Sequence, residues 1–222
     1  MKIILCGLIL CVLPSLAMAS SWCKPNKSPT INVRTSTDNI NYDFSLSEKQ
    51  LNKFSITTVN PYGDNVITDV GGLMKGGIET TQQMSFGTMT NPNINQMCLW
   101  HDTIEITLHI RPTIFVANDF PQGTCMHNAI LEHEHKHVIV DREIVNKYAA
   151  LIGQAIRNDV NKYRIYGPVP ASKSQALVSQ VKGRMQNILK TYTNQMSAER
   201  RKRQQAVDSL AEYQRVSNSC KR

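Results

Sequence analysis

The first half of the chain alternates apolar and polar residues in short runs, a pattern typical of β-strands with one buried face. Turn residues separate the runs, as at Asn60-Pro61-Tyr62-Gly63. The strongest alternation covers residues 98–110 and resumes after Pro112. The predicted strands are residues 30–35, 39–44, 79–89, 98–110 and 113–117, the first two joined as a hairpin by a turn at 37–38.

The second half changes to apolar residues at helical spacing. No proline or glycine occurs from residue 126 to residue 152, and the helix predicted over residues 126–165 ends at Gly167-Pro168. A second apolar stripe begins at Leu177 and predicts a helix over residues 172–217. A short proline-containing turn between two long amphipathic helices predicts an antiparallel hairpin.

Together these patterns predict an α+β fold: a small, mostly antiparallel sheet followed by a long antiparallel helical hairpin. The length of 222 residues suits one domain, or one domain with an appendage. We expect a signal peptide over residues 1–19 and a single domain over residues 20–222. Within that domain, residues 20–125 form the β-rich part and residues 126–222 the helical hairpin.

The first 19 residues have the features of a secretory signal peptide. Lys2 precedes an apolar run that ends in Ala17-Met18-Ala19, an A-x-A cleavage pattern. We therefore expect cleavage near Ala19 and a periplasmic or secreted protein. The apolar run is short for a membrane span, and the mature chain is expected to have no transmembrane segment. Lipidation at Cys23 is not favoured, because the large Trp22 precedes it.

Four cysteines follow the predicted signal peptide, and an even number in an exported chain predicts two disulfides. Three pairings are possible. We favour Cys98–Cys125, which would close the strands leading into the first long helix, and Cys23–Cys220, which would join the two ends of the mature chain. Metal ligation by these cysteines is the alternative, but no C-x-x-C spacing supports it.

The formal net charge is +8, and the basic residues are densest at Arg200-Arg201-Lys202-Arg203. Such a run is either a solvated helix face or a contact for an anionic partner, such as an acidic envelope polymer or a phospholipid surface. No nucleic-acid recognition motif accompanies it, so no nucleic-acid partner is expected.

The chemistry of the chain centres on His133-Glu134-His135-Lys136-His137, which fits the pattern H-E-x-x-H. Residues four apart lie on one face of a helix, so the imidazoles of His133 and His137 are predicted to share one zinc ion. Glu134 follows the first ligand directly and is predicted to act as the general base.

This motif resembles that of the zincin metallopeptidases. A weaker resemblance extends over most of the chain: a β-rich front half, a cysteine just before the H-E-x-x-H helix and a long helical tail ending in cysteine are similar to bacterial exported zinc-dependent proteases of undefined substrate. The resemblance implies that His133 and His137 are metal ligands, that Glu134 is the catalytic base, and that a peptide or protein is the substrate. It also makes the strand region 98–117 a candidate for pairing with the substrate main chain.

No third ligand follows the motif at a spacing familiar from that family. If the predicted hairpin turns near Val169, His137 lies level with about Arg201. Glu199 continues the apolar stripe of the second helix and is one candidate ligand. Asp208 also fits the level but lies nearly opposite the stripe. Asp141 lies one turn beyond His137 and is better suited to supporting a histidine than to binding metal.

Two other functions fit the same residues. One is a metal-binding protein without catalytic activity, in which His127 and His135 join His133 and His137 to hold copper, nickel or zinc. The other is a structural adaptor that offers the helical hairpin to partner proteins. An exported zinc peptidase is the function that we expect from the sequence.

Overall fold

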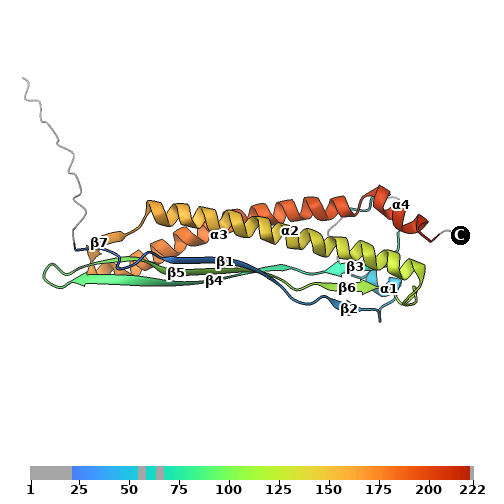
Figure 1. The fold of residues 1–222 in the computed structure, drawn as a ribbon, viewed down its shortest axis with the longest axis horizontal. Coiled ribbons are helices and arrows are strands. Elements are labelled where there is room, and N and C mark those ends of the chain that lie inside the picture. Colours follow the sequence, from blue (N-terminus) through green and yellow to red (C-terminus); the bar gives the residue numbers. More distant parts are fainter. Residues whose placement is uncertain (1–21, 55–58, 64–67, 221–222) are drawn as a thin grey trace, which may run out of the picture.

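The computed structural model describes residues 22–54, 59–63 and 68–220 (Figure 1). The predicted signal peptide lies outside these residues. The α+β class is confirmed. The elements are β1 (Thr30–Thr37), β2 (Asn41–Asp43), α1 (Glu48–Leu51), β3 (Gly72–Lys75), β4 (Ile78–Asn91), β5 (Gln96–Ile110), β6 (Thr113–Val116), α2 (Cys125–Lys162), β7 (Tyr166–Pro170), the 3₁₀ turn η1 (Ala171–Lys173), α3 (Ser174–Val207) and α4 (Leu210–Asn218).

The strands form two sheets that follow each other along the length of the molecule (Figure 1). Their orders are β1-β5-β4 and β2-β6-β3, with β7 added to the start of β5. β1 and β2 run parallel to β5 and β6, whereas β4, β3 and β7 run antiparallel to them. Three of the five pairings among the described residues are thus antiparallel, as predicted, but the sheets are mixed.

The predicted hairpin between residues 30–35 and 39–44 is wrong. β1 pairs with β5 and β2 pairs with β6, both in parallel. The connection between them stays bonded to the central strands, because the Asp38 N–H donates to Ile110 O and the Asn41 N–H donates to Pro112 O, each at 3.0 Å. The chain therefore continues in one direction along the edge of both sheets instead of reversing at residues 37–38.

α2 and α3 are antiparallel and pack on one face of the larger sheet (Figure 1). Their direction follows from side-chain pairs such as Asp159–Arg184 and Lys147–Glu199. The alternation predicted for β5 is confirmed, since every second residue from Ile104 to Ile110 is buried against the helices. The main core comprises these residues together with Ile144, Ile152, Ile156, Met185 and Leu189, among others. No helix among the described residues is long and apolar enough to cross a membrane.

α3 does not present one straight stripe to α2. Its buried residues follow in steps of four over much of its length, as in Leu177, Val181, Met185 and Leu189, and later Met196 and Gln204. Four residues turn a helix by about 400°, so each step moves the buried face by about 40° around the axis. α3 then ends at Val207, and α4 starts at Leu210, where Ser209 Oγ accepts a hydrogen bond from the Glu212 N–H. The single helix predicted to residue 217 is thus two helices with a break.

Two disulfides are present, but both predicted pairings are wrong. The observed pairs are Cys23–Cys98 and Cys125–Cys220. Because β1 runs parallel to β5, the segment before β1 lies beside the start of β5, which brings Cys23 to Cys98. Because α3 and α4 return along α2, the end of the chain reaches the first residue of α2, which brings Cys220 to Cys125.

Candidate metal centre

His133 and His137 lie side by side on α2, as their spacing predicts. Their ring centroids are 5.0 Å apart, and both side chains are buried. The helix that carries them is long and continuous, and it begins at a proper cap, since Thr124 Oγ1 accepts a hydrogen bond from the His127 N–H. The pair is therefore fixed on a regular helix face.

Asp208 completes the group. Its Oδ1 lies 3.1 Å from Nε2 of His133 and 3.1 Å from Nε2 of His137. One ligand atom from each of the three residues lies within 4.8 Å of the others, a grouping able to hold a metal ion. The break between α3 and α4 falls at Asp208, which is the C-cap of α3. Of the three candidate third ligands, only Asp208 joins the histidines.

The other ring nitrogen of each histidine faces an acceptor. His137 Nδ1 contacts Gln204 Oε1, and His133 Nδ1 lies 3.4 Å from Glu212 Oε1. An acceptor oxygen requires the N–H form at Nδ1, which leaves Nε2 as the lone-pair nitrogen in a neutral ring. This is the arrangement found in metal-binding histidines, where the second nitrogen donates to a carboxylate or carbonyl oxygen. Both histidines thus direct toward Asp208 the nitrogen that could bind a metal ion.

The polar contacts between α2 and α3 continue beyond His137, on the side away from Glu212. The Gln204 amide donates to His137 O at 3.1 Å and to Asp141 Oδ1 at 2.7 Å. Asp141 in turn accepts two hydrogen bonds from Arg200, at 2.6 and 2.9 Å. We call this series the polar ladder: His133, His137 and Asp141 on α2, facing Arg200, Gln204, Asp208 and Glu212 on α3, α4 and the break between them. Asp141 therefore supports His137 through Gln204, as predicted. It does not belong to the group of residues that could hold a metal ion.

Glu134 points from α2 toward β3. It accepts a hydrogen bond from the backbone of Met74, and a Cβ atom built on Gly72 would lie only 2.7 Å from Glu134 Oε1. The close approach of this strand to the carboxylate therefore requires glycine at position 72. Burial raises the pKa of Glu134, and the neighbouring charges of His137 and His133 oppose that shift.

Charged residues on α2, on α4 and at the break before α4 change the pKa values of His137 and Glu212. Burial opposes the charged form of His137, but the hydrogen bond with Asp208 and the charge of Glu134 outweigh it and raise the pKa of His137. The Arg215 guanidinium, with Lys136 and His133, lowers the pKa of Glu212 to about 2 against the effect of its burial. Glu212 is thus an anion at neutral pH and holds α4 against α2.

Aromatic side chains cover the group. The ring of Tyr213 on α4 lies 5.7 Å from that of His133, and the ring of Tyr62 lies 6.1 Å from Tyr213. Burial raises the pKa of Tyr213, as do the charges of Asp208 and Glu134, so its hydroxyl stays protonated at neutral pH. Close in sequence to Tyr62, the Val59 N–H donates to Gln205 Oε1 at 2.6 Å, and Val59 O accepts from Gln205 Nε2 at 3.1 Å.

The centre is enclosed. The exposed fractions of His133, Glu134, His137 and Asp208 are 7%, 4%, 8% and 6%. Two surface cavities, one between β1 and α2 and one along α2 and α3, include none of these residues. Among the described residues, Tyr213 on α4 lies next to His133, and Tyr62 lies next to Tyr213.

Glu199 is not at the centre, contrary to one prediction. Its carboxylate accepts hydrogen bonds from Lys147 Nζ at 2.6 Å and from the Tyr148 hydroxyl at 3.1 Å. These partners lie about 15 Å along α2 from His137, at 1.5 Å per residue. The predicted stripe advanced at a strict 3.6-residue period, whereas the real face of α3 turns around the helix. This turn brings Asp208 to the histidines and leaves Glu199 behind.

The remaining histidines lie elsewhere. His127 Nδ1 contacts Phe120 O at 3.1 Å, and His135 Nε2 lies 3.3 Å from the Tyr42 hydroxyl. The four-histidine site considered for a metal-storage protein is therefore not formed. Lys136, on the same turn of α2, forms an ion pair with Glu212, with Nζ 2.7 Å from Oε1.

Gln204, Glu212 and Tyr213 were not identified from the sequence. A signal for the first two was present: Gln204, Asp208 and Glu212 are spaced by four, as are His133, His137 and Asp141. Two polar series with the same spacing on facing helices indicate a buried polar interface. Tyr213 and Gly72 had no such signal.

The basic run at residues 200–203 is partly neutralised within the fold. Arg200 binds Asp141, and Arg203 binds Glu143. Contact with an anionic surface stays a prediction, and it now depends mainly on Arg201 and Lys202, which are both exposed.

No family model, no curated protein and no solved structure matches this chain in the three comparisons with known proteins. The function is therefore argued from the geometry of the centre.

Proposed function

We propose that this protein is an exported, zinc-dependent peptidase whose metal is held by His133, His137 and Asp208. The observation that carries the proposal is the convergence of the two Nε2 atoms and Asp208 Oδ1, with Glu134 beside them on the same helix. Two disulfides are consistent with an oxidising compartment outside the cytoplasm.

The donor set fits zinc. Two imidazoles and a carboxylate are ligands that zinc accepts, and three protein ligands leave a position open for a reacting molecule. Both imidazoles have their second nitrogen held by an acceptor, which orients the rings toward the metal. When bound, the ion would supply Lewis-acid activation of a water molecule and of a peptide carbonyl.

The side chains of this chain supply the proton transfers. Glu134 takes a proton from the attacking water and passes it to the leaving amine. Gly72 and the backbone of Met74 hold its carboxylate at the strand edge. Tyr213, whose ring lies 5.7 Å from that of His133, offers a protonated hydroxyl suited to donating to the oxyanion that develops on the carbonyl.

The substrate strand differs from the one expected. β5 and β6 have partners on both sides, so the main chain of region 98–117 is largely occupied. Among the described residues, β3 pairs only with β6 and lies at the sheet edge beside Glu134. We propose this edge as the place where an extended peptide pairs with the enzyme.

Glu134→Gln tests the proposal. The variant keeps the size of the side chain but cannot act as a base, so hydrolysis of a quenched fluorescent peptide library should fall by about 10²–10⁴-fold while one zinc per chain is kept. Glu132→Gln, on the exposed side of the same helix turn, is the matched control. Equal hydrolysis by the wild type and Glu134→Gln would reject the peptidase.

A second candidate function is a metal-binding protein without catalysis. The enclosure of the centre favours it, since no surface cavity described above reaches the metal ligands. It predicts one bound zinc, no hydrolysis by the wild type on any peptide of the library, and unchanged zinc affinity in Glu134→Gln.

A further inference from the structure

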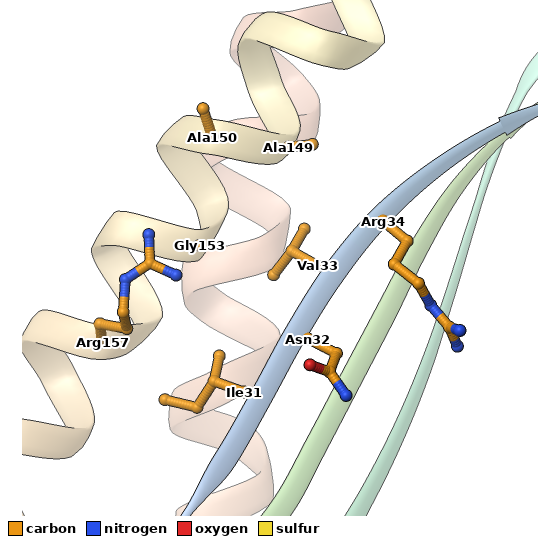
Figure 2. A pocket seen from close by; sticks show the side chains of 8 residues that line it. All are labelled: Ile31, Asn32, Val33, Arg34, Ala149, Ala150, Gly153 and Arg157. Carbon is orange, nitrogen blue, oxygen red and sulfur yellow. The ribbon is translucent and has the colours of Figure 1, made fainter.

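β1 and α2 enclose a groove on the side of the molecule away from the sheet edge at β3. Its volume is about 270 Å³, and Ile31, Asn32, Val33 and Arg34 line one wall while Ala149, Ala150, Gly153 and Arg157 line the other (Figure 2). Ile31 and Val33 point toward α2, whereas Asn32 and Arg34 point away from it (Figure 2). Consecutive residues from both faces of the strand line the groove, so it runs along the strand edge.

This edge of β1 has main-chain groups to offer. In the part of the chain that the structure describes, β1 is the outermost strand of its sheet and pairs only with β5. Within the described ranges, no other backbone or side chain bonds to the outward N–H and C=O groups of residues 31–34. An exposed row of such groups is a template for an added strand.

Two arginines at the groove favour an occupant with acidic side chains. The Arg157 guanidinium folds over Gly153, where a Cβ atom would lie 3.2 Å from Nη1. Arg34 extends from β1 on the opposite face of the sheet (Figure 2). Neither arginine has an acidic partner in the part of the chain that the structure describes. An added strand would therefore meet one positive charge on each of its two faces.

The geometry points to a docking site for an extended segment of another protein that carries two acidic residues three positions apart. Side chains of a strand alternate between faces, so residues separated by three lie on opposite faces. One acidic residue, beside Ile31, would face Arg157, and the other would lie beside Arg34. Between them, an apolar side chain beside Val33 would fill the space over Ala149 and Ala150. This inference does not depend on the proposed peptidase.

Fluorescence anisotropy with the full purified chain tests it. The probe is a fluorescein-labelled, blocked hexapeptide Thr-Glu-Val-Val-Glu-Thr, which reads the same in both strand directions. We expect saturable binding that weakens by about tenfold in Arg157→Glu and in Arg34→Glu, and that is unchanged in Arg142→Glu, an exposed residue of α2 outside the groove. The double variant Arg34→Glu/Arg157→Glu should bind the probe with lysine in place of glutamate.

A second probe, N-methylated at every residue, tests strand addition itself, because it lacks main-chain N–H donors, and it should not bind. Equal binding of the two probes, or no binding of the first probe to the wild type, overturns the proposal. Light scattering without any probe tests the remaining possible occupant, a second copy of the chain, by measuring the molar mass in solution. A dimer that Arg157→Glu dissociates would assign this edge to a second copy of the chain and would also overturn the proposal.

Discussion

The two halves of the α2–α3 pair have the same residue spacing at their contact but opposite chemistry, apolar in one half and polar in the other. In the half near β7, α2 presents Ile152 and Ile156, and α3 presents Met185 and Leu189, all buried in the main core. In the half near α4, the same two helices face each other through the polar ladder defined above. Both halves advance in steps of about four residues, so the helix geometry continues while the chemistry changes.

The difference indicates which half of the helix pair stabilises the fold and which half could bind a metal ion. Burial of a large aliphatic side chain contributes about 1.5–3 kcal/mol to stability. Burial of charged groups opposes folding unless each has a partner, and replacing such a network with apolar residues is often neutral or stabilising. The apolar half therefore accounts for stability. The polar half gains little stability from its hydrogen bonds and ion pairs, and it holds the group that we propose as a metal site.

The largest effect on this comparison is expected from His137→Ala. This change removes one of three ligands and leaves Asp208 and Gln204 without their shared partner. Zinc affinity should fall by at least about 10³-fold, since a two-ligand site rarely retains the metal. Competition with a chelating indicator measures it, and His135→Ala is the control on the same helix. Unchanged affinity in His137→Ala would mean that the polar half does not bind zinc.

The converse change in the apolar half is Ile152→Ala. Ile152 has an exposed fraction of 0% and lies in the main core. Its truncation should lower the free energy of unfolding by about 2–5 kcal/mol because of lost burial and the cavity left behind. Urea unfolding measures the loss. Zinc stoichiometry at 25 °C should be unchanged, and its loss would show that the two halves are coupled.

A smaller effect is expected from Gln204→Leu, which removes the support of His137 but no ligand. The His137 ring loses its acceptor, and Asp141 loses one donor. Zinc affinity should fall by about 10–100-fold, as for other residues that orient a metal ligand. Gln205→Leu is the matched control, because it removes the contact with Val59 instead. An equal loss in both variants would contradict a specific role for Gln204.

The smallest effect is expected from Glu199→Gln, outside the polar ladder. The hydrogen bond from Lys147 lowers the pKa of Glu199 in the folded chain. A lowered pKa means that the carboxylate stabilises the fold at neutral pH and that this contribution disappears as the pH falls through the lowered value. Because the pair is largely exposed, the loss in Glu199→Gln should be small at pH 7 and should disappear as the pH falls below the lowered pKa. A larger loss in acid would contradict the assignment.

Much of the fold follows from local patterns. The alternation in β5 and the helical spacing in α2 predict their elements within a few residues, because each buries one face against a single neighbouring layer. The pairing of β1 with β5 and both disulfides were not predictable in the same way. They depend on strand direction, and a turn-like sequence at residues 37–38 does not distinguish a reversal from a bend that stays bonded to the central strands.

The residues of the candidate centre likewise fall into those that local spacing predicts and one that depends on how the helices pack. His133, Glu134 and His137 are neighbours on one helix, so their spacing alone brings them together. Asp208 comes from another element, and its position depends on the gradual turn of the α3 face and on the break before α4. A periodic extrapolation carries an error that grows along the helix, and it placed Glu199 where Asp208 lies.

The measurement that tests this account most directly is the metal content of the purified protein by elemental analysis, with Asp208→Asn and Glu199→Gln beside the wild type. Both variants exchange a carboxylate for an amide of nearly the same size, and only one removes a proposed ligand. The account predicts one zinc per chain in the wild type and in Glu199→Gln, and a large loss in Asp208→Asn. Zinc retained by Asp208→Asn, or lost from Glu199→Gln, would contradict it.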